Sequence, residues 1–71
     1  MGIQKVGVVG LGDVGSVCSA CLASRGHQVV GVDTSTYKVD CIERGESPIV
    51  EKDLGELIAA SRREGRLSAT T

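Results

Sequence analysis

The sequence is nearly free of aromatic residues: its 71 residues include one tyrosine, Tyr37, and neither tryptophan nor phenylalanine. It therefore has no set of rings on which the bases of a single-stranded nucleic acid could stack. Charge of one sign is also lacking, because 8 basic and 9 acidic side chains give a net charge of −1. Without a basic patch or stripe, we expect no nucleic-acid partner.

Long uninterrupted hydrophobic runs are absent as well. Asp13 and several glycines interrupt the apolar N-terminal region, and Arg25 and His27 follow it. A membrane span needs about 20 consecutive apolar residues, and a secretory signal needs a continuous apolar segment. Three cysteines without a targeting signal suit a reducing compartment. We therefore expect no membrane association and a cytoplasmic location.

Glycine, in contrast, is abundant and its spacing is informative. A G-x-G-x-x-G motif follows the apolar run Val6–Val9 directly, and Asp33 closes a second apolar run, Val29–Val32. Strand, glycine turn, helix, strand and acid in this order are the fingerprint of a dinucleotide-binding unit. The candidate residues of the turn are Gly10, Leu11, Gly12, Asp13, Val14 and Gly15.

The chemistry of this motif follows from the backbone. Gly10 allows a tight turn, Gly12 lets a pyrophosphate lie against the main chain, and Gly15 lets the next helix pack closely on the strand. The phosphates would then meet free N–H groups at the positive end of a helix.

Asp33 is expected to accept hydrogen bonds from both ribose hydroxyls of the adenosine half. Its charge would repel a 2′-phosphate, and the next residue is Thr34 rather than an arginine that could bind one. Both features favour NAD over NADP. The alternative is that Asp33 is a solvated residue that caps the following helix.

The hydrophobic pattern predicts an α/β fold with a β-α-β-α-α order, the incomplete start of a Rossmann-type doubly wound parallel sheet. Val14, Val17, Cys18, Cys21 and Leu22 have helical spacing and are expected to pack the first helix on the sheet. The predicted strands are 3–9 and 28–32, the helices are 14–25, 35–44 and about 53 to 64, and residues 66–71 enter a possible third strand.

Several details of these elements can also be predicted. Thr34 or Ser35 should cap the second helix, and residues 46–50 should form a loop around Pro48. Asp53 should cap the third helix and form a capping box with Glu56.

The length indicates an incomplete domain. A full doubly wound domain has about six strands and usually 100 to 200 residues. The run Val6–Val9 reads as a central strand that needs neighbours on both sides. We therefore expect residues 1–71 to be the N-terminal fragment of an NAD-binding domain whose remaining strands lie elsewhere.

Cys18 and Cys21 form a C-x-x-C pair, a spacing found in zinc and redox sites. Zinc needs four ligands, and the chain adds only Cys41 and His27. A redox pair usually lies at a helix N-terminus, whereas these cysteines fall in mid-helix. The favoured interpretation is that both pack the helix onto the sheet, with redox or metal roles as the alternative. No metal site is predicted, and His27 is expected to lie in a turn far from the ligand.

The whole chain resembles the N-terminus of the UDP-glucose/GDP-mannose dehydrogenase family. The most specific matches are the segments 45–51 (Gly-Glu-Ser-Pro-Ile-Val-Glu) and 65–71 (Gly-Arg-Leu-Ser-Ala-Thr-Thr), besides the glycine motif, 20–23, 26–33 and 38–40. By motif position, the resemblance implies NAD contacts at 10–15, at Asp33 and at Lys38. Lys38 could instead be an ordinary solvated lysine.

The resemblance also implies a reaction: oxidation of a sugar C6 alcohol to a carboxylate with two NAD molecules, through a cysteine nucleophile. That cysteine belongs to a later domain, so no catalytic residue is expected in this chain. Val50 favours GDP-mannose as substrate, with UDP-glucose next. The nucleotide sugar would bind through C-terminal regions, and the full-length enzyme is expected to be a homo-oligomer.

Two positions depart from the family pattern. Asp13 replaces a usual tyrosine, which brings like charges together near the pyrophosphate. Lys52 and Asp53 replace a usual proline and glycine. Two other functions remain open: a stand-alone nucleotide-binding or regulatory module, and another NAD-dependent enzyme such as a hydroxyacid dehydrogenase.

Overall fold

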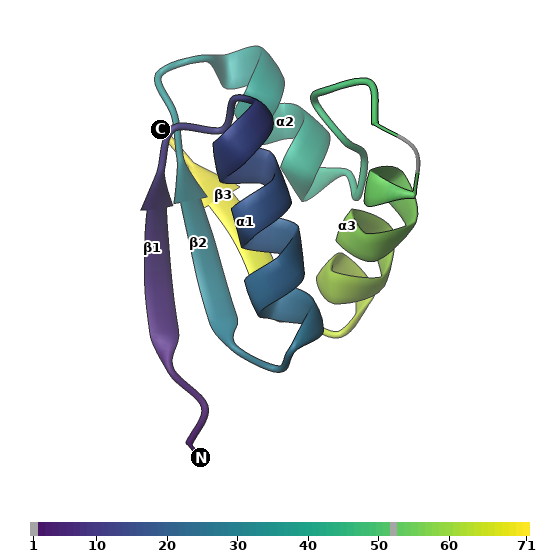
Figure 1. Cartoon of the computed structure of the whole chain (residues 1–71). Coiled ribbons are helices and arrows are strands. Elements are labelled where there is room, and N and C mark those ends of the chain that lie inside the picture. The colour runs from purple at the N-terminus through teal and green to yellow at the C-terminus, as the bar shows by residue number, and fades with distance from the viewer. Residues whose placement is uncertain (1, 52) are drawn as a thin grey trace.

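The computed structural model describes residues 2–51 and 53–71 and confirms the α/β class. The segment expected to enter a third strand does form one, so the order of the described elements is β-α-β-α-α-β (Figure 1). The elements are β1 (Lys5–Val9), α1 (Asp13–Ser24), β2 (Gln28–Val32), α2 (Thr36–Glu43), α3 (Leu54–Arg63) and β3 (Leu67–Thr70).

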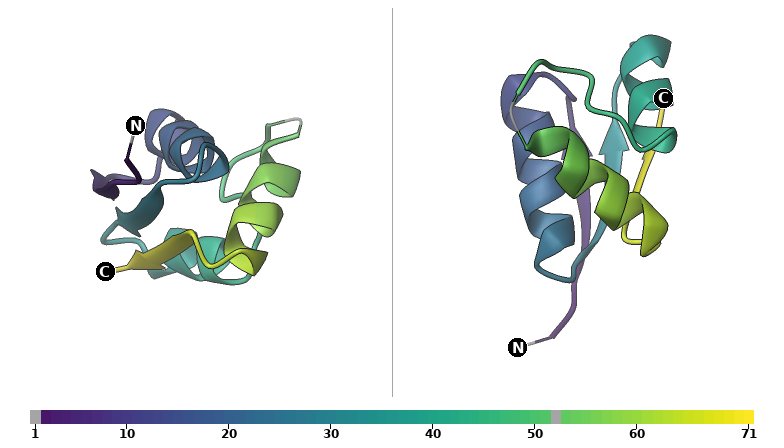
Figure 2. Two further views of the ribbon diagram at one scale, coloured as in Figure 1. Left: turned by 90° about the horizontal axis from the view of Figure 1, so that it is seen from below. Right: turned by 90° about the vertical axis from the view of Figure 1, so that its right-hand side faces the viewer.

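The three strands are parallel and lie in the order β1-β2-β3. Helices α1, α2 and α3 cover one face of this sheet, and no described helix covers the opposite, bare face (Figure 2). Two crossovers in the same direction along a sheet place their helices on one face when both are right-handed. Among the described residues β1 pairs only with β2, and the predicted central strand therefore lies at an edge, with Val9 87% exposed.

The prediction for the buried face of α1 was wrong for four of its five residues, and only Leu22 packs against the core. Val14 and Val17 are exposed, as are Cys18 and Cys21. The residues that α1 buries are smaller ones at the same helical spacing: Ser16, Ser19, Ala20 and Ala23. Small side chains let the helix approach β2 and α3 closely, and this close approach outweighed the larger apolar residues in choosing the face.

The second and third helices begin differently. Ser35 caps α2 as predicted, since its hydroxyl accepts a hydrogen bond from the N–H of Lys38. The capping box predicted for α3 is not formed, because Asp53 has a left-handed backbone with φ of 70° and its side chain makes no capping bond. That conformation suits glycine, the residue that the family resemblance implies at this position.

The core lies between the sheet and the helices. Leu54 and Ile58 contribute the predicted apolar face of α3, and Val39 and Ile42 contribute that of α2, whereas Leu57 is partly exposed. None of the helices among the described residues is long and apolar enough to cross a membrane. The other buried apolar residues of the cluster are Leu11, Ala20, Ala23, Val29, Leu67 and Ala69.

Candidate cofactor site

The site is built on the turn that joins β1 to α1. Gly10 has φ of +95°, which a residue with a side chain rarely adopts, and its N–H donates to the carbonyl of Val32 at 2.7 Å. A Cβ on Gly15 would lie 1.6 Å from the carbonyl oxygen of Gly10. The structure therefore requires glycine at both positions for the fold itself, as the motif predicts.

Gly12 has a different role. Its φ of −73° is open to any residue, and a Cβ there would meet no protein atom within 4 Å. It is the N-cap of α1 without a side-chain capping bond, so the first-turn N–H groups face outward at the positive end of the helix. This open cradle fits a phosphate, because a side chain would fill the space in front of those N–H groups.

The two residues after Gly12 are both exposed. Asp13 is the acidic residue of the first turn of α1, and Val14 has 76% of its surface accessible. A carboxylate here favours the helix through its dipole, whereas it would oppose a bound pyrophosphate.

Leu11 lies in the turn but points away from the cradle. Its side chain is fully buried against β2, where a Cβ on Gly31 would lie 2.6 Å from Leu11 Cδ2. Its N–H donates to Asp33 Oδ2 at 2.7 Å, and its carbonyl accepts from the Ser16 hydroxyl at 2.8 Å. Both polar groups of Leu11 are thus engaged within the protein, and the residue shapes the turn.

Asp33, at the end of β2, links the turn to the next helix. Its Oδ2 accepts from Leu11, and its Oδ1 accepts from the N–H of Ser35 at 2.8 Å. The N–H of Leu11 is the main cause that lowers the pKa of Asp33 below its usual 3.8, followed by the N–H of Ser35 and the charge of Lys38, against partial burial. The carboxylate is therefore held ionised and fixed in direction, with acceptor capacity left over.

A hollow of about 310 Å³ opens beside this carboxylate, at the carboxyl ends of the strands. Ligands of open α/β sheets bind at this end, next to the glycine turn. No arginine is among the lining residues, so the described part of the chain offers no guanidinium to a 2′-phosphate here. The lining residues are Val9, Gly10, Val32, Asp33, Thr34 and Thr71.

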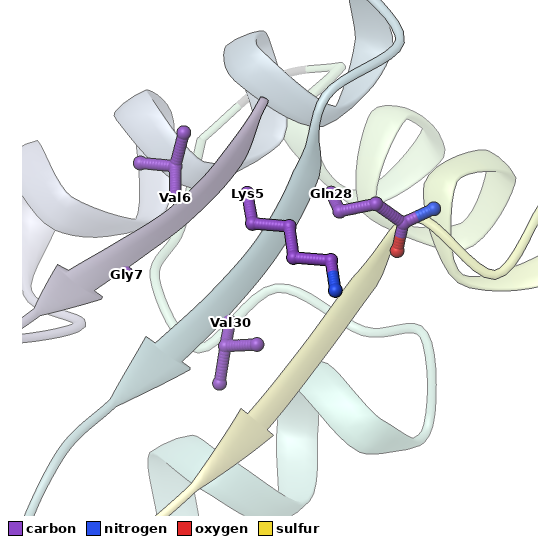
Figure 3. A pocket seen from close by; sticks show the side chains of 5 residues that line it. All are labelled: Lys5, Val6, Gly7, Gln28 and Val30. Atoms are coloured by element: carbon purple, nitrogen blue, oxygen red, sulfur yellow. The ribbon is translucent and has the colours of Figure 1, made fainter. Parts of the chain in front are cut away.

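A larger hollow, of about 380 Å³, lies on the bare face of the sheet (Figure 3). Lys5, Gly7, Gln28 and Val30 line it together with Val6, and the Lys5 side chain extends across β2. Neither Asp33 nor any residue of the glycine turn lines this larger hollow. The hollow of about 310 Å³ is the one that lies beside the Asp33 carboxylate and the start of the glycine turn.

The structure brings the predicted glycine turn and Asp33 together and places Lys38 in the first turn of α2, where its charge acts on Asp33. It also identifies two supporting residues that the sequence reasoning missed, Ser16 and Gly31. A glycine inside a strand signals close approach of another group and could have revealed Gly31. Ser16 gives no comparable signal.

The remaining candidates lie apart from this site. His27 is in the turn before β2, where its Nδ1 accepts from the N–H of Gln4 at 3.2 Å. Cys41 is a buried residue of α2 itself. Within residues 2–51 and 53–71, no three potential ligands among His, Cys, Asp and Glu come together to hold a metal ion.

Comparison with known proteins defines the class. Residues 4–71 match the UDP-glucose/GDP-mannose dehydrogenase family, NAD binding domain. The chain is 55% identical over 68 residues to a GDP-mannose 6-dehydrogenase of Azotobacter vinelandii, covering 96% of this chain and 16% of that protein. The chain therefore belongs to this family and spans about one sixth of the length of that relative.

Solved structures agree with this assignment. The fold matches a GDP-mannose dehydrogenase of Pseudomonas aeruginosa, solved as a ternary complex, with a TM-score of 0.88 and 51% identity over 96% of this chain and 15% of that one. It matches a UDP-glucose dehydrogenase of Pyrobaculum islandicum with a TM-score of 0.91 and 35% identity, over 97% and 16% of the two chains. The Rossmann-type fold and NAD as the cofactor of the class are thereby confirmed.

Proposed function

We propose that this chain is the NAD-binding segment of a nucleotide-sugar 6-dehydrogenase, which oxidises the C6 alcohol of a sugar to a carboxylate. GDP-mannose is the favoured sugar nucleotide and UDP-glucose the next. The observation that supports the cofactor role is the Leu11–Asp33 hydrogen bond, which holds a ribose-binding carboxylate beside an open phosphate cradle. The higher identity to GDP-mannose dehydrogenases than to the UDP-glucose dehydrogenase supports the substrate.

Each site residue has a role in this proposal. The N–H groups from Gly12 to Gly15, with Asp13 and Val14 between them, hold the pyrophosphate, and Gly10 and Leu11 shape the turn. Asp33 accepts from the ribose hydroxyls with its remaining lone pairs. Lys38, half-buried in the first turn of α2, lies toward the ribose or the adenine edge. NAD, when bound, supplies the hydride acceptor for the oxidation.

The chemistry on the sugar belongs to parts of the protein outside this chain. We assign no catalytic role to Cys18, Cys21 or Cys41, because none of them lies beside the glycine turn. The sugar nucleotide would bind through C-terminal regions of a cytoplasmic homo-oligomer.

Two measurements test it. The intact protein should reduce NAD in the presence of GDP-mannose and do so faster than with UDP-glucose, whereas the 71-residue chain alone should produce no NADH above background. Faster turnover of UDP-glucose would overturn the substrate choice. Turnover by the isolated chain would overturn the assignment of the sugar chemistry to other parts of the protein. NAD binding by the intact protein without turnover of either sugar nucleotide would favour a binding module.

A further inference from the structure

Helix α1 carries two exposed cysteines, and packing of the helix on the sheet does not explain why they are there. Cys18 and Cys21 are both free and exposed. Together with Leu22 and Arg25 they line a hollow of about 240 Å³. These positions follow the i, i+3, i+4, i+7 spacing of a single helical face. The two thiols, the leucine side chain and the arginine guanidinium therefore lie next to one another.

The spacing of the two cysteines disfavours a disulfide. Residues three apart on a helix have Cβ atoms about 5–6 Å apart, whereas an unstrained disulfide needs about 3.5–4.5 Å. A metal ion between the sulfurs removes this conflict. Two metal–sulfur bonds of about 2.3 Å, the length known for zinc, span up to about 4.6 Å between the sulfurs. The undistorted helix can supply that separation through its side-chain rotamers.

The number and kind of ligands select the ion. Zinc takes four protein ligands in structural sites, but the described residues bring no third His, Cys, Asp or Glu to this pair. Soft thiolate ligands select Cu(I), zinc and iron–sulfur clusters, and the last two are usually held by four protein ligands. Cu(I) has a filled d shell and accepts two ligands in line.

We propose that α1 carries a surface site for Cu(I), bound by the thiolates of Cys18 and Cys21. Binding one Cu⁺ to two thiols releases two protons and transfers no electron, and it leaves a bis-thiolate complex of charge −1. The guanidinium of Arg25, one turn beyond Cys21, balances that charge. The site lies along the outer face of α1 and is independent of the cofactor role proposed above.

The test is a competitive titration of the reduced, intact protein with Cu(I) under anaerobic conditions, against the chromophoric chelator bicinchoninate. The parent protein should bind one more Cu(I) per chain than the Cys18→Ser variant does, and one more than the Cys21→Ser variant does. Cys41→Ala is the matched control and should keep that equivalent, because Cys41 is buried. Arg25→Gln should weaken it about twofold to fivefold, as expected for an exposed charge pair.

Circular dichroism and NAD affinity, measured on every variant, establish that each one is folded. Equal Cu(I) uptake by the parent and both serine variants would overturn the proposal. Loss of the equivalent in only one serine variant would show a single-thiol site and would also overturn it. A stoichiometry of one Cu(I) per two chains would overturn it in favour of a site shared between copies.

Discussion

Gly12 and Gly15 belong to one motif, yet the structure predicts that alanine at these two positions has opposite consequences. At Gly15 a Cβ would lie 1.6 Å from the carbonyl oxygen of Gly10, which is backbone and cannot rotate away. At Gly12 a Cβ would meet no protein atom within 4 Å, and φ of −73° suits alanine. Gly15→Ala should therefore damage the fold, and Gly12→Ala should damage only the phosphate cradle.

The magnitudes follow from these contacts. Overpacking a core costs about 1–3 kcal/mol when side chains can shift, so a clash with fixed backbone should cost more than about 3 kcal/mol of unfolding free energy. At Gly12, alanine is a poorer N-cap but restricts the unfolded chain, so the net change should stay within about 1 kcal/mol. In contrast, the methyl group would occupy the space of a phosphate, and the Kd for NAD should rise more than about tenfold.

Urea unfolding and NAD titration of both variants in the intact protein measure the two effects separately. The parent protein and Gly2→Ala, at a position where a Cβ also meets nothing, are the controls. Equal destabilisation by Gly12→Ala and Gly15→Ala would refute the reasoning, as would unchanged NAD affinity in Gly12→Ala.

Further predictions concern three acidic residues. Asp33→Asn presents one acceptor and one donor to two N–H groups, those of Leu11 and Ser35, so one of these hydrogen bonds is lost. In titrations with both cofactors, NAD affinity should fall about 10- to 100-fold, and the ratio of NAD affinity to NADP affinity should decrease. Because the pKa of Asp33 is lowered in the folded protein, the ionised side chain should stabilise the fold fully at pH values above its ordinary pKa of 3.8. This stabilisation should be lost as the pH falls through the lower pKa of the folded state, and acid unfolding of the parent and of Asp33→Asn will measure the loss. Asp13→Asn should tighten NAD binding about twofold to fivefold at low salt and leave it unchanged at about 1 M salt; tighter binding by the parent would contradict this. Asp53→Gly should stabilise the protein by about 0.5–1 kcal/mol in urea unfolding, since φ at this position is 70°; destabilisation would count against it.

The sequence predicted the fold class and the turn because both depend on local signals. Glycine at positions 10 and 15 is required by backbone geometry that any sequence with this spacing must meet. The second strand and helix were predicted closely, with Ser35 as the cap, because a capping hydroxyl acts within three residues.

The buried face of α1 and the start of α3 depend on tertiary packing and could not be predicted from the sequence. The periodicity of α1 allows either a face of valines and cysteines or a face of serines and alanines. The second face is the buried one, because its small side chains let the helix approach β2 and α3 closely. Similarly, Asp53 directly precedes α3 and is of a residue type common at helix N-caps, but its backbone is left-handed and its side chain makes no capping bond.

In the proposed cofactor site, hydrogen bonds within the protein fix the direction of the Asp33 carboxylate. A free carboxylate at the end of a strand would lose rotamer freedom on binding a ribose, and this loss opposes affinity. Here the N–H groups of Leu11 and Ser35 already fix both oxygens, and Leu11 is itself fixed by Ser16 and by its packing on Gly31. The same bonds join the phosphate turn to the end of β2, so the two halves of the site keep their relative position. A substitution at Gly31, which is too buried to touch NAD, should therefore weaken NAD binding by displacing Leu11, and an unchanged affinity in Gly31→Ala would show that the turn holds its shape without this contact.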